Sequence, residues 1–176
     1  RLSVREVAKK GTVLVGFHEK RSSFIADMKS CEILPKRVSD LLVPLRELIN
    51  SLSLRKKLPQ IELAVTDEAL ALVLRVLEKP TADDEAKLRQ FQKDYGVDFW
   101  YQPKGPDSIY PMDPENAARL KLHHRETGVE VVFRPTDFTQ VNHRLNEVMV
   151  TRALRLLHLE PSSKVIDFFC GLGNFT

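Results

Sequence analysis

The chain has 176 residues, of which 43% are apolar and 29% are charged, as in an ordinary globular protein and unlike a disordered or fibrous one. It contains no apolar run near the roughly 20 residues that cross a bilayer, and its two cysteines are too few for a disulfide framework. We therefore predict a cytoplasmic protein without a membrane partner. The net charge of +3 permits an RNA partner without requiring one.

Strand and helix signals alternate in the first part of the chain. Alternating apolar residues predict a hairpin formed by residues 2–7 and 12–17, and a third strand at 23–28. Apolar residues at helical spacing predict a helix over about 36–50, which Pro44 should kink or divide.

The middle of the chain predicts a second hairpin and a helix. Residues 61–65 and 69–77 read as strands joined by a turn at 66–68. Thr81 is a candidate N-cap for a helix that ends at Gly96, and a strand follows at 97–101. Four prolines between residues 102 and 116 predict a long surface loop.

The pattern of predicted elements changes in the last part of the chain. Residues 120–124 and 129–133 predict a third hairpin, a long amphipathic helix should run over about 138–158, and a buried strand should begin near residue 164. We predict an α/β fold with a domain boundary between residues 134 and 135, because helix followed by strand replaces the mixed pattern there.

The closing segment carries the most specific motif. Asp167 ends an apolar run, and Gly171 and Gly173 follow it in a Gly-x-Gly turn. Such a turn after a strand suits an S-adenosylmethionine loop, where the backbone approaches the ligand closely. A dinucleotide site lacks its third glycine, since Thr176 stands there, and no Gly-Lys-Ser/Thr supports a P-loop. A tight turn without a ligand stays open as an alternative.

Two amides precede the predicted long helix. Gln140 and Asn142 can donate and accept hydrogen bonds, as a cofactor pocket requires. The alternative is that Asp137 or Thr139 caps the helix while both amides face solvent.

Basic residues gather in the first hairpin and the loop after it. Near-neighbour cations suit a phosphate track, and these are the candidates: Arg1, Arg5, Lys9, Lys10, His18, Lys20 and Arg21. A second cluster at 55–57 is expected to be solvated. His123 and His124 are adjacent on a predicted strand, so they should face opposite ways and not chelate one metal.

Taken together, the segments Asp-Phe-Thr-Gln-Val-Asn-x-x-x-Asn (137–146) and Asp-Phe-Phe-Cys-Gly-Leu-Gly-Asn-Phe-Thr (167–176), with Met149-Val150 and Ala153-Leu154 between them, resemble the RNA uracil-5 methyltransferases, and most closely their iron–sulfur branch. The resemblance implies S-adenosylmethionine-dependent methylation of C5 of a uridine in 23S rRNA. It implies an α/β central domain over 1–134, associated with RNA and an iron–sulfur cluster. The incomplete start of a Rossmann-like class I methyltransferase domain would occupy 135–176.

The resemblance also assigns roles to residues. It implies cofactor contacts for Gln140, Asp167, Phe169, Gly171, Gly173 and Asn174. It places Phe138 beside an extruded uracil, where an aromatic ring can stack on the base. The alternative for Phe138 is a core residue at the helix start. The resemblance favours RNA contact for the first basic cluster, which includes Arg1, Arg5, Lys9, Lys10 and Arg21.

Cys31 matches the family's fourth ligand to a 4Fe–4S cluster, although Glu32 stands where a proline is common. One thiolate cannot hold such a cluster, so we expect none in this chain alone. Cys170 is expected to be a small residue packed in the turn.

The catalytic Cys and Glu of the family have no counterpart between residues 1 and 176, so we predict an inactive fragment of an enzyme with no obligate protein partner. A non-catalytic RNA-binding module and a class I methyltransferase with another substrate remain as alternatives.

Overall fold

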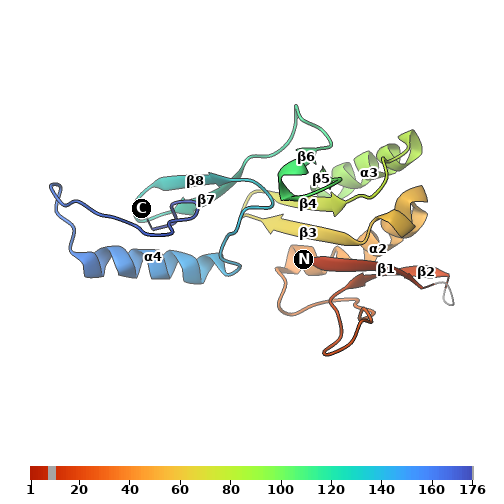
Figure 1. Ribbon diagram of the computed structural model, residues 1–176, viewed down its shortest axis with the longest axis horizontal. Helices are drawn as coiled ribbons and strands as arrows, with labels where there is room; N and C mark the ends of the chain where they lie inside the picture. The colour runs from red at the N-terminus through yellow and green to blue at the C-terminus, as the bar shows by residue number, and fades with distance from the viewer. Residues whose placement is uncertain (8–10, 176) are drawn as a thin grey trace. The chain divides into compact units, whose positions relative to one another are not determined.

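The computed structural model describes residues 1–7 and 11–175, and the chain divides into two compact units, Arg1–Ala118 and Arg119–Thr176. Within the described residues, six strands form the sheet of the first unit and two strands form that of the second (Figure 1). The chain is thus a mixed α/β protein, as predicted.

The sheet of the first unit has the strand order β2-β1-β3-β4-β5-β6. Only β4 and β5 pair in parallel, and the remaining neighbours are antiparallel. The strands span these residues: β1 Leu2–Val7, β2 Thr12–Gly16, β3 Gln60–Val65, β4 Leu70–Arg75, β5 Asp98–Gln102 and β6 Tyr110–Pro111. Both predicted hairpins, β1–β2 and β3–β4, are confirmed, and the turn residues 8–10 lie outside the described residues.

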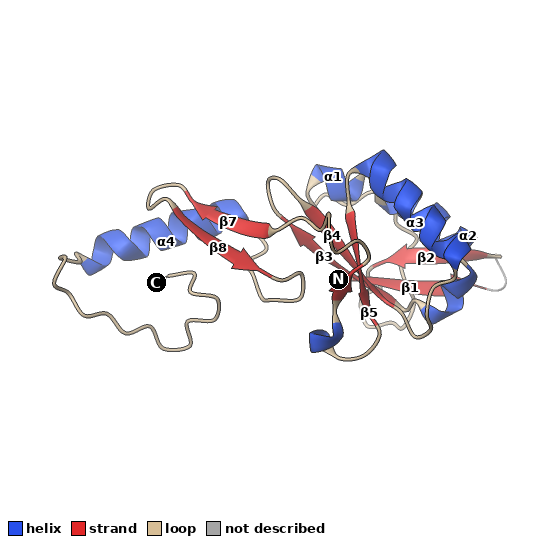
Figure 2. Cartoon of the chain, turned by 90° about the horizontal axis from the view of Figure 1, so that it is seen from above, coloured by secondary structure: helices blue, strands red, loops and turns tan. Residues whose placement is uncertain are grey.

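Helices cover one face of this sheet (Figure 2). Leu45 and Ile49 of one helix and Leu88 of another are buried in a single apolar core with Leu72 and Phe99 of the sheet. Leu70, Leu72 and Leu74, which alternate along β4, all join this core. The helical segments of the unit are α1 Lys36–Ser39, α2 Leu42–Ser51, the 3-10 helix η2 Ser53–Lys57, α3 Ala82–Tyr95 and the 3-10 helix η3 Pro106–Ser108.

The predicted limits of α3 are confirmed by its caps. The Thr81 side chain accepts a hydrogen bond from the backbone N–H of Asp84, and the Asp84 side chain accepts one from the backbone N–H of Thr81. This capping box satisfies two donors at the helix start. Gly96 ends the helix in the left-handed conformation, with φ of 60°, which glycine adopts without a Cβ penalty.

The predicted helix over 36–50 is divided, as Pro44 led us to expect. The break falls at Asp40 and Leu41, between α1 and α2. Pro44 occupies the third position of α2, within the first turn, where a backbone N–H has no partner inside the helix. The proline therefore helps to define where α2 begins and leaves its later turns regular.

Two other predictions in the first unit are corrected. Residues 23–28 form no strand, only an isolated bridge between His18 and Ile25, because the loop after β2 turns back on itself instead of extending the sheet. The proline-rich segment 102–116 is not entirely loop. It contains η3, and β6 adds an edge to the sheet by pairing with β5.

Gly16 at the end of β2 predicts a packing effect. A Cβ built there would lie 2.7 Å from the carbonyl oxygen of Ala26 and 3.0 Å from Sδ of Met28. Because a backbone carbonyl cannot swing aside, we expect Gly16→Ala to lower the free energy of unfolding by about 1–3 kcal/mol. Gly105→Ala is the matched control, since a Cβ there meets nothing within 4 Å. Urea denaturation of both variants measures the difference, and equal stability of the two would contradict it.

The second unit consists of a hairpin and a helix. Strands β7 Leu120–His124 and β8 Val129–Phe133 pair antiparallel, which confirms the third predicted hairpin. Helix α4 spans His143–Leu157. The hairpin and α4 belong to one compact unit, whereas we had placed the hairpin in the domain before residue 135. Compactness does not decide where a methyltransferase domain begins, so the boundary at 134/135 stays a prediction.

Two predictions in the second unit are wrong. α4 begins at His143 rather than near Phe138, because residues 134–137 close a turn of their own: the N–H of Asp137 donates to the carbonyl of Arg134. Residues from 164 to 168 form no strand. A strand needs a ladder partner, and the sheet of this unit within the described residues contains only β7 and β8. The start of a Rossmann-like domain is therefore not confirmed.

No helix in the described ranges combines the length and apolarity that crossing a bilayer demands.

Candidate functional site

Side chains on α4 hold the helix to the turn of the β7–β8 hairpin. Glu126 Oε1 accepts a hydrogen bond from Nε of Arg155 at 3.1 Å, and the carboxylate of Glu147 accepts one from the N–H of Arg125 at 3.3 Å. Hydrogen bonds from Arg155 and then Thr151 lower the pKa of Glu126 below its ordinary value. The helix is thereby oriented at several successive turns.

The start of α4 differs from both predicted caps. Asn142 is the N-cap, and its Oδ1 accepts from the N–H of Leu145 at 3.0 Å. Asp137 instead accepts from the N–H of Arg134 at 2.7 Å, which closes the preceding turn. Asparagine and aspartate compete for such local bonds with similar strength. Sequence alone did not show which of them the helix would use.

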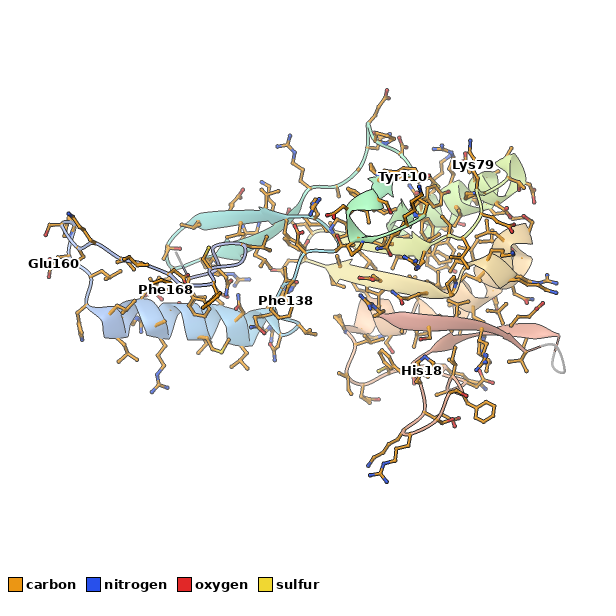
Figure 3. The ribbon with its side chains drawn as sticks, in the orientation of Figure 1. His18, Lys79, Tyr110, Phe138, Glu160 and Phe168 are labelled. Carbon is orange, nitrogen blue, oxygen red and sulfur yellow. The ribbon has the colours of Figure 1, made fainter. Side chains whose placement is uncertain are left out.

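The residues before α4 face solvent. Gln140 is exposed, and Phe138 is 80% exposed beside the N-terminal end of the helix (Figure 3). The alternative of Phe138 as a core residue is therefore wrong. An exposed phenylalanine has a free ring face available to a planar partner.

The predicted cofactor loop has the backbone that its glycines indicated. Gly171 and Gly173 have φ of 59° and 80°, and the N–H of Gly173 donates to the carbonyl of Cys170 at 3.0 Å. Phe169 also has a positive φ, 64°, and a fully exposed side chain. Asp167 is half-buried. Cys170 is exposed, so the expectation that it packs in the turn is wrong, because its neighbours Phe168, Phe169 and Gly171 are themselves exposed and form no core around it.

A reciprocal pair of hydrogen bonds joins this loop to α4. Nδ2 of Asn146 donates to Oδ1 of Asn174, and Nδ2 of Asn174 donates to Oδ1 of Asn146, both at 2.8 Å. Asn146 is only 3% exposed and Asn174 is half-buried, so the pair is partly sheltered from water. Each amide keeps a second N–H and a second lone pair. Asn174 can therefore bind a further polar group while Asn146 holds it.

The pairing brings the two sequence motifs together, the one that enters α4 and the one that ends the chain. Asn174 was predicted as a cofactor contact, but its partner Asn146 was not. Asn146 is the last residue of the family motif at 137–146, four residues after Asn142, but the motif gave it no role of its own. That spacing indicates a shared side of the helix without naming what lies opposite.

Some of the basic residues predicted to contact RNA already bond to other groups of the first unit. A guanidinium nitrogen of Arg1 lies 2.8 Å from Oε1 of Glu62, and Arg5 donates to the carbonyl of Ser23 at 2.7 Å. Arg21 is exposed, with φ of 57°. Lys9 and Lys10 lie outside the described residues. The second cluster, expected to be solvated, pairs on the surface with Glu6 and Glu78.

Cys31 lies just before α1. It is half-buried against the apolar core, and its N–H donates to Oγ of Ser39 at 2.8 Å. No group of three or more His, Cys, Asp or Glu side chains able to hold a metal occurs in the part of the chain that the structure describes. These residues do not by themselves fit a cluster that needs four thiolates.

The two adjacent histidines point to opposite faces of β7, as predicted. Nδ1 of His123 lies 3.3 Å from Oε1 of Glu130 on the exposed side. His124 is buried, and neither ring nitrogen has a hydrogen-bond partner within the described residues.

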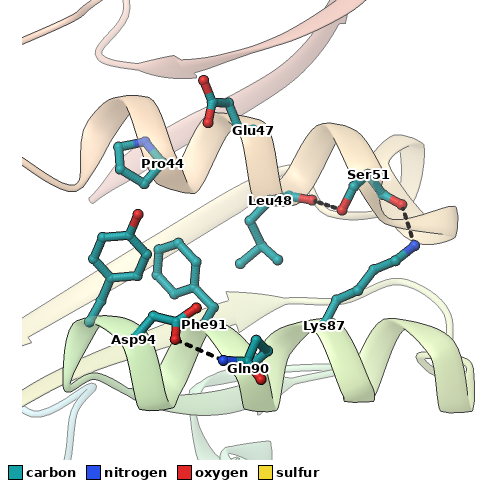
Figure 4. A pocket seen from close by; sticks show the side chains of 9 residues that line it. Pro44, Glu47, Leu48, Ser51, Lys87, Gln90, Phe91 and Asp94 are labelled. Carbon is teal, nitrogen blue, oxygen red and sulfur yellow. Dashed lines mark hydrogen bonds between the residues drawn. The ribbon is translucent and has the colours of Figure 1, made fainter.

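A surface groove lies between α2 and α3 in the first unit (Figure 4). It has a volume of about 340 Å³ and is lined by apolar side chains such as Leu48 and Phe91 and by the acids Glu47 and Asp94. It contains none of the predicted cofactor or RNA residues.

Comparison with known proteins finds relatives that share one name. No family model matches the chain. It is 57% identical over 176 residues to the 23S rRNA (uracil(1939)-C(5))-methyltransferase RlmD of Cupriavidus necator, and 59% identical over 176 residues to the protein of the same name from Burkholderia lata. The protein of that name from Ralstonia pickettii is 56% identical over 176 residues. All of this chain is covered in each case.

The chain is homologous to the 23S rRNA uracil-5 methyltransferases. It covers 40%, 38% and 39% of these three relatives, so it spans about two fifths of their length. The resemblance noted in the sequence is thereby confirmed at the level of the family. The roles of individual residues stay predictions, because the comparisons match whole segments and assign no function to any side chain.

Proposed function

We propose that this chain forms part of an enzyme that methylates C5 of a uridine in 23S rRNA, with S-adenosylmethionine as methyl donor. The observation that carries the proposal is the reciprocal amide pair between Asn146 and Asn174. It fastens a Gly-x-Gly loop to the helix that follows Gln140. The names of the relatives supply the substrate and the reaction type.

Two features of the loop suit S-adenosylmethionine, the methyl donor. Gly171 adopts a positive φ and has open space where a Cβ would stand, so a ligand can approach the backbone. Asn174 retains one N–H and one lone pair for a polar group of the ligand. When bound, S-adenosylmethionine supplies an electrophilic methyl group. Gln140, Asp167 and Phe169 are proposed to complete this wall of the pocket.

The residues of this chain would then bind the RNA and orient the target base. Phe138 offers a ring face to an extruded base, which offsets part of the cost of unstacking it. Exposed cations of the first unit would contact phosphates. The proposed Rossmann-like domain begins at residue 135, and the nucleophilic Cys and the basic Glu lie in sequence other than residues 1–176.

Cys31 is proposed as one ligand of a 4Fe–4S cluster whose other thiolates lie outside residues 1–176. Its half-buried thiol beside the core suits a ligand that must be shielded from water. The described residues supply no further ligands, so no step of the reaction is assigned to the cluster.

Activity can be tested by exchange of segments. We expect a chimera in which this chain replaces the homologous segment of the Cupriavidus necator relative to transfer labelled methyl from S-adenosylmethionine to 23S rRNA as 5-methyluridine. The chain alone should transfer none, because it lacks the nucleophile. Mass spectrometry of nucleosides from the treated RNA measures both. A chimera that is folded and binds RNA but transfers no methyl would contradict the proposal and favour a binding module.

A further inference from the structure

The loop that follows β2 is built around its own hydrogen bonds. We call residues 18–25 the Phe24 loop; it projects away from the sheet in Figure 1, and Figure 3 labels His18 at its start. His18 and Ile25 form a bridge, and the N–H of Glu19 donates to the carbonyl of Phe24 at 3.0 Å. Ile25 is buried and anchors the loop to the unit.

A residue from the sheet fixes the position of the loop. The guanidinium of Arg5 on β1 donates to the carbonyl of Ser23 at 2.7 Å. Within the loop, the N–H of Phe24 donates to Oγ of Ser22 at 3.0 Å. Phe24 is thus held by local bonds while its ring makes little contact, since the residue is 68% exposed.

Arg21 occupies a position in this loop that favours glycine. The N–H of Ser22 donates to the carbonyl of Glu19 at 3.1 Å, which closes a turn with Arg21 at its third position. Its φ of 57° lies in the left-handed region, which costs conformational free energy for a residue with a Cβ. A strained arginine on an exposed turn suggests that its side chain serves a function.

We propose that the Phe24 loop is a contact site for single-stranded RNA, in which Phe24 stacks on a base while Lys20 and Arg21 contact phosphates. Lys20, Arg21 and Phe24 are all exposed. Glu19 is the only acidic residue of the loop. An aromatic ring flanked by cations is the combination that binds unpaired nucleotides, because every base has a face for stacking and every nucleotide a phosphate.

The choice of RNA as partner rests on the proposed function, since the relatives act, by their names, on 23S rRNA. The site is distinct from the proposed cofactor loop. Arg5, Arg21 and Phe24 all belong to the first unit, whereas Asn146 and Asn174 belong to the second. RNA binding at the Phe24 loop can therefore be measured without methyl donor and without turnover.

The test measures binding of this chain to a fluorescein-labelled, twelve-nucleotide single-stranded RNA of mixed sequence by anisotropy. We expect Phe24→Leu to weaken binding about tenfold and Phe24→Trp to retain it, because stacking requires a ring. Arg21→Gly should also weaken binding and reduce the dependence on salt by about one phosphate contact. Its melting temperature should be unchanged or raised, since glycine accepts the positive φ without strain.

Lys79→Gln is the matched control for lost charge, because Lys79 is an exposed cation elsewhere on the first unit (Figure 3). It should change binding less than twofold. Equal affinity of Phe24→Leu and the unchanged chain would overturn the proposal, as would no measurable RNA binding by the chain. Binding to vesicles containing phosphatidylserine but not to RNA would also overturn it and indicate a membrane partner. None of these results bears on methyl transfer by the chimera, which is measured separately.

Discussion

Replacing Asp84 by asparagine is expected to cost more stability than any other single change discussed above. The Asp84 carboxylate is fully buried and accepts four hydrogen bonds: from N–H and Oγ of Ser53 at 2.7 and 2.6 Å, and from N–H and Oγ1 of Thr81 at 3.0 and 2.9 Å. An amide presents N–H to donors where a carboxylate oxygen stood. We expect a loss of about 3 kcal/mol, since bonds to a charged group contribute about 1.5–3 kcal/mol each.

Asp83→Asn is the matched control. Asp83 lies on the same turn of α3 but is exposed, and its carboxylate pairs with Nζ of Lys87 at 2.7 Å on the surface. Such exposed pairs contribute about 0–1 kcal/mol. Thermal denaturation of both variants measures the contrast. A loss from Asp84→Asn no larger than that from Asp83→Asn would show that the buried network does not stabilise the first unit.

The same carboxylate predicts a dependence of stability on pH. Burial by itself would raise the pKa of Asp84, but hydrogen bonds from Ser53 and Thr81 lower it below the ordinary 3.8. A lowered pKa in the folded state means that the ionised form stabilises the fold. That stabilisation is complete above pH 3.8 and is lost as the pH falls through the folded-state value. The stability advantage over Asp84→Asn should therefore shrink in acid, as urea denaturation at neutral and acidic pH can measure.

Loss of the Asn146 amide is expected to weaken cofactor binding most. In the chimera, Asn146→Ala removes both bonds to Asn174 and leaves the loop without its attachment to α4. We expect the Kd for S-adenosylmethionine to rise about tenfold or more, because Asn174 must then be ordered at the expense of binding free energy. Isothermal titration calorimetry measures the change, and Asn174→Ala should give a similar loss.

Val150→Ala is a control that separates a role of Asn146 in positioning the loop from a general loss of stability of the second unit. Val150 is the other buried residue of α4, and shortening it should destabilise the unit by about 1–3 kcal/mol while the hydrogen-bonding amides of Asn146 and Asn174 are kept. Its effect on donor affinity should be small. In a double-mutant cycle, Asn146→Ala and Asn174→Ala should couple by about 0.5–3 kcal/mol. Additive losses, or an equal loss from Val150→Ala, would contradict a positioning role.

Much of the first unit could be predicted from local patterns. Alternation indicated β1–β2 and β3–β4, and Thr81 and Gly96 marked both ends of α3. These features depend on residues close in sequence, so propensity and capping suffice. Residues 23–28 show the limit: they alternate like a strand, yet whether an alternating segment joins a sheet depends on a free edge elsewhere in the fold.

In the candidate site, too, some features could be predicted from the sequence and others could not. The glycine turn, Gln140 and Asn174 were identified from motifs, and the family that they indicated is confirmed by the relatives. Asn146 belongs to the family motif, but its role in holding the loop was missed, because the two asparagines are 28 positions apart and pair only when the chain folds back. Lys20 and Arg21 of the Phe24 loop were among the predicted phosphate contacts, but Phe24 itself was missed for a related reason. An aromatic residue in a strand-like segment indicates core, and only burial shows that its ring is exposed.

By itself, the order of residues indicated the family through its motifs. It also determined the caps of α3, the hairpins and the backbone of the glycine loop, since each of these follows from short-range sterics and hydrogen bonding. Tertiary structure decided which asparagine supports the loop and which aromatic rings stay in solvent. Those outcomes are settled by competition between distant groups for the same buried space and the same hydrogen bonds, which no local pattern records.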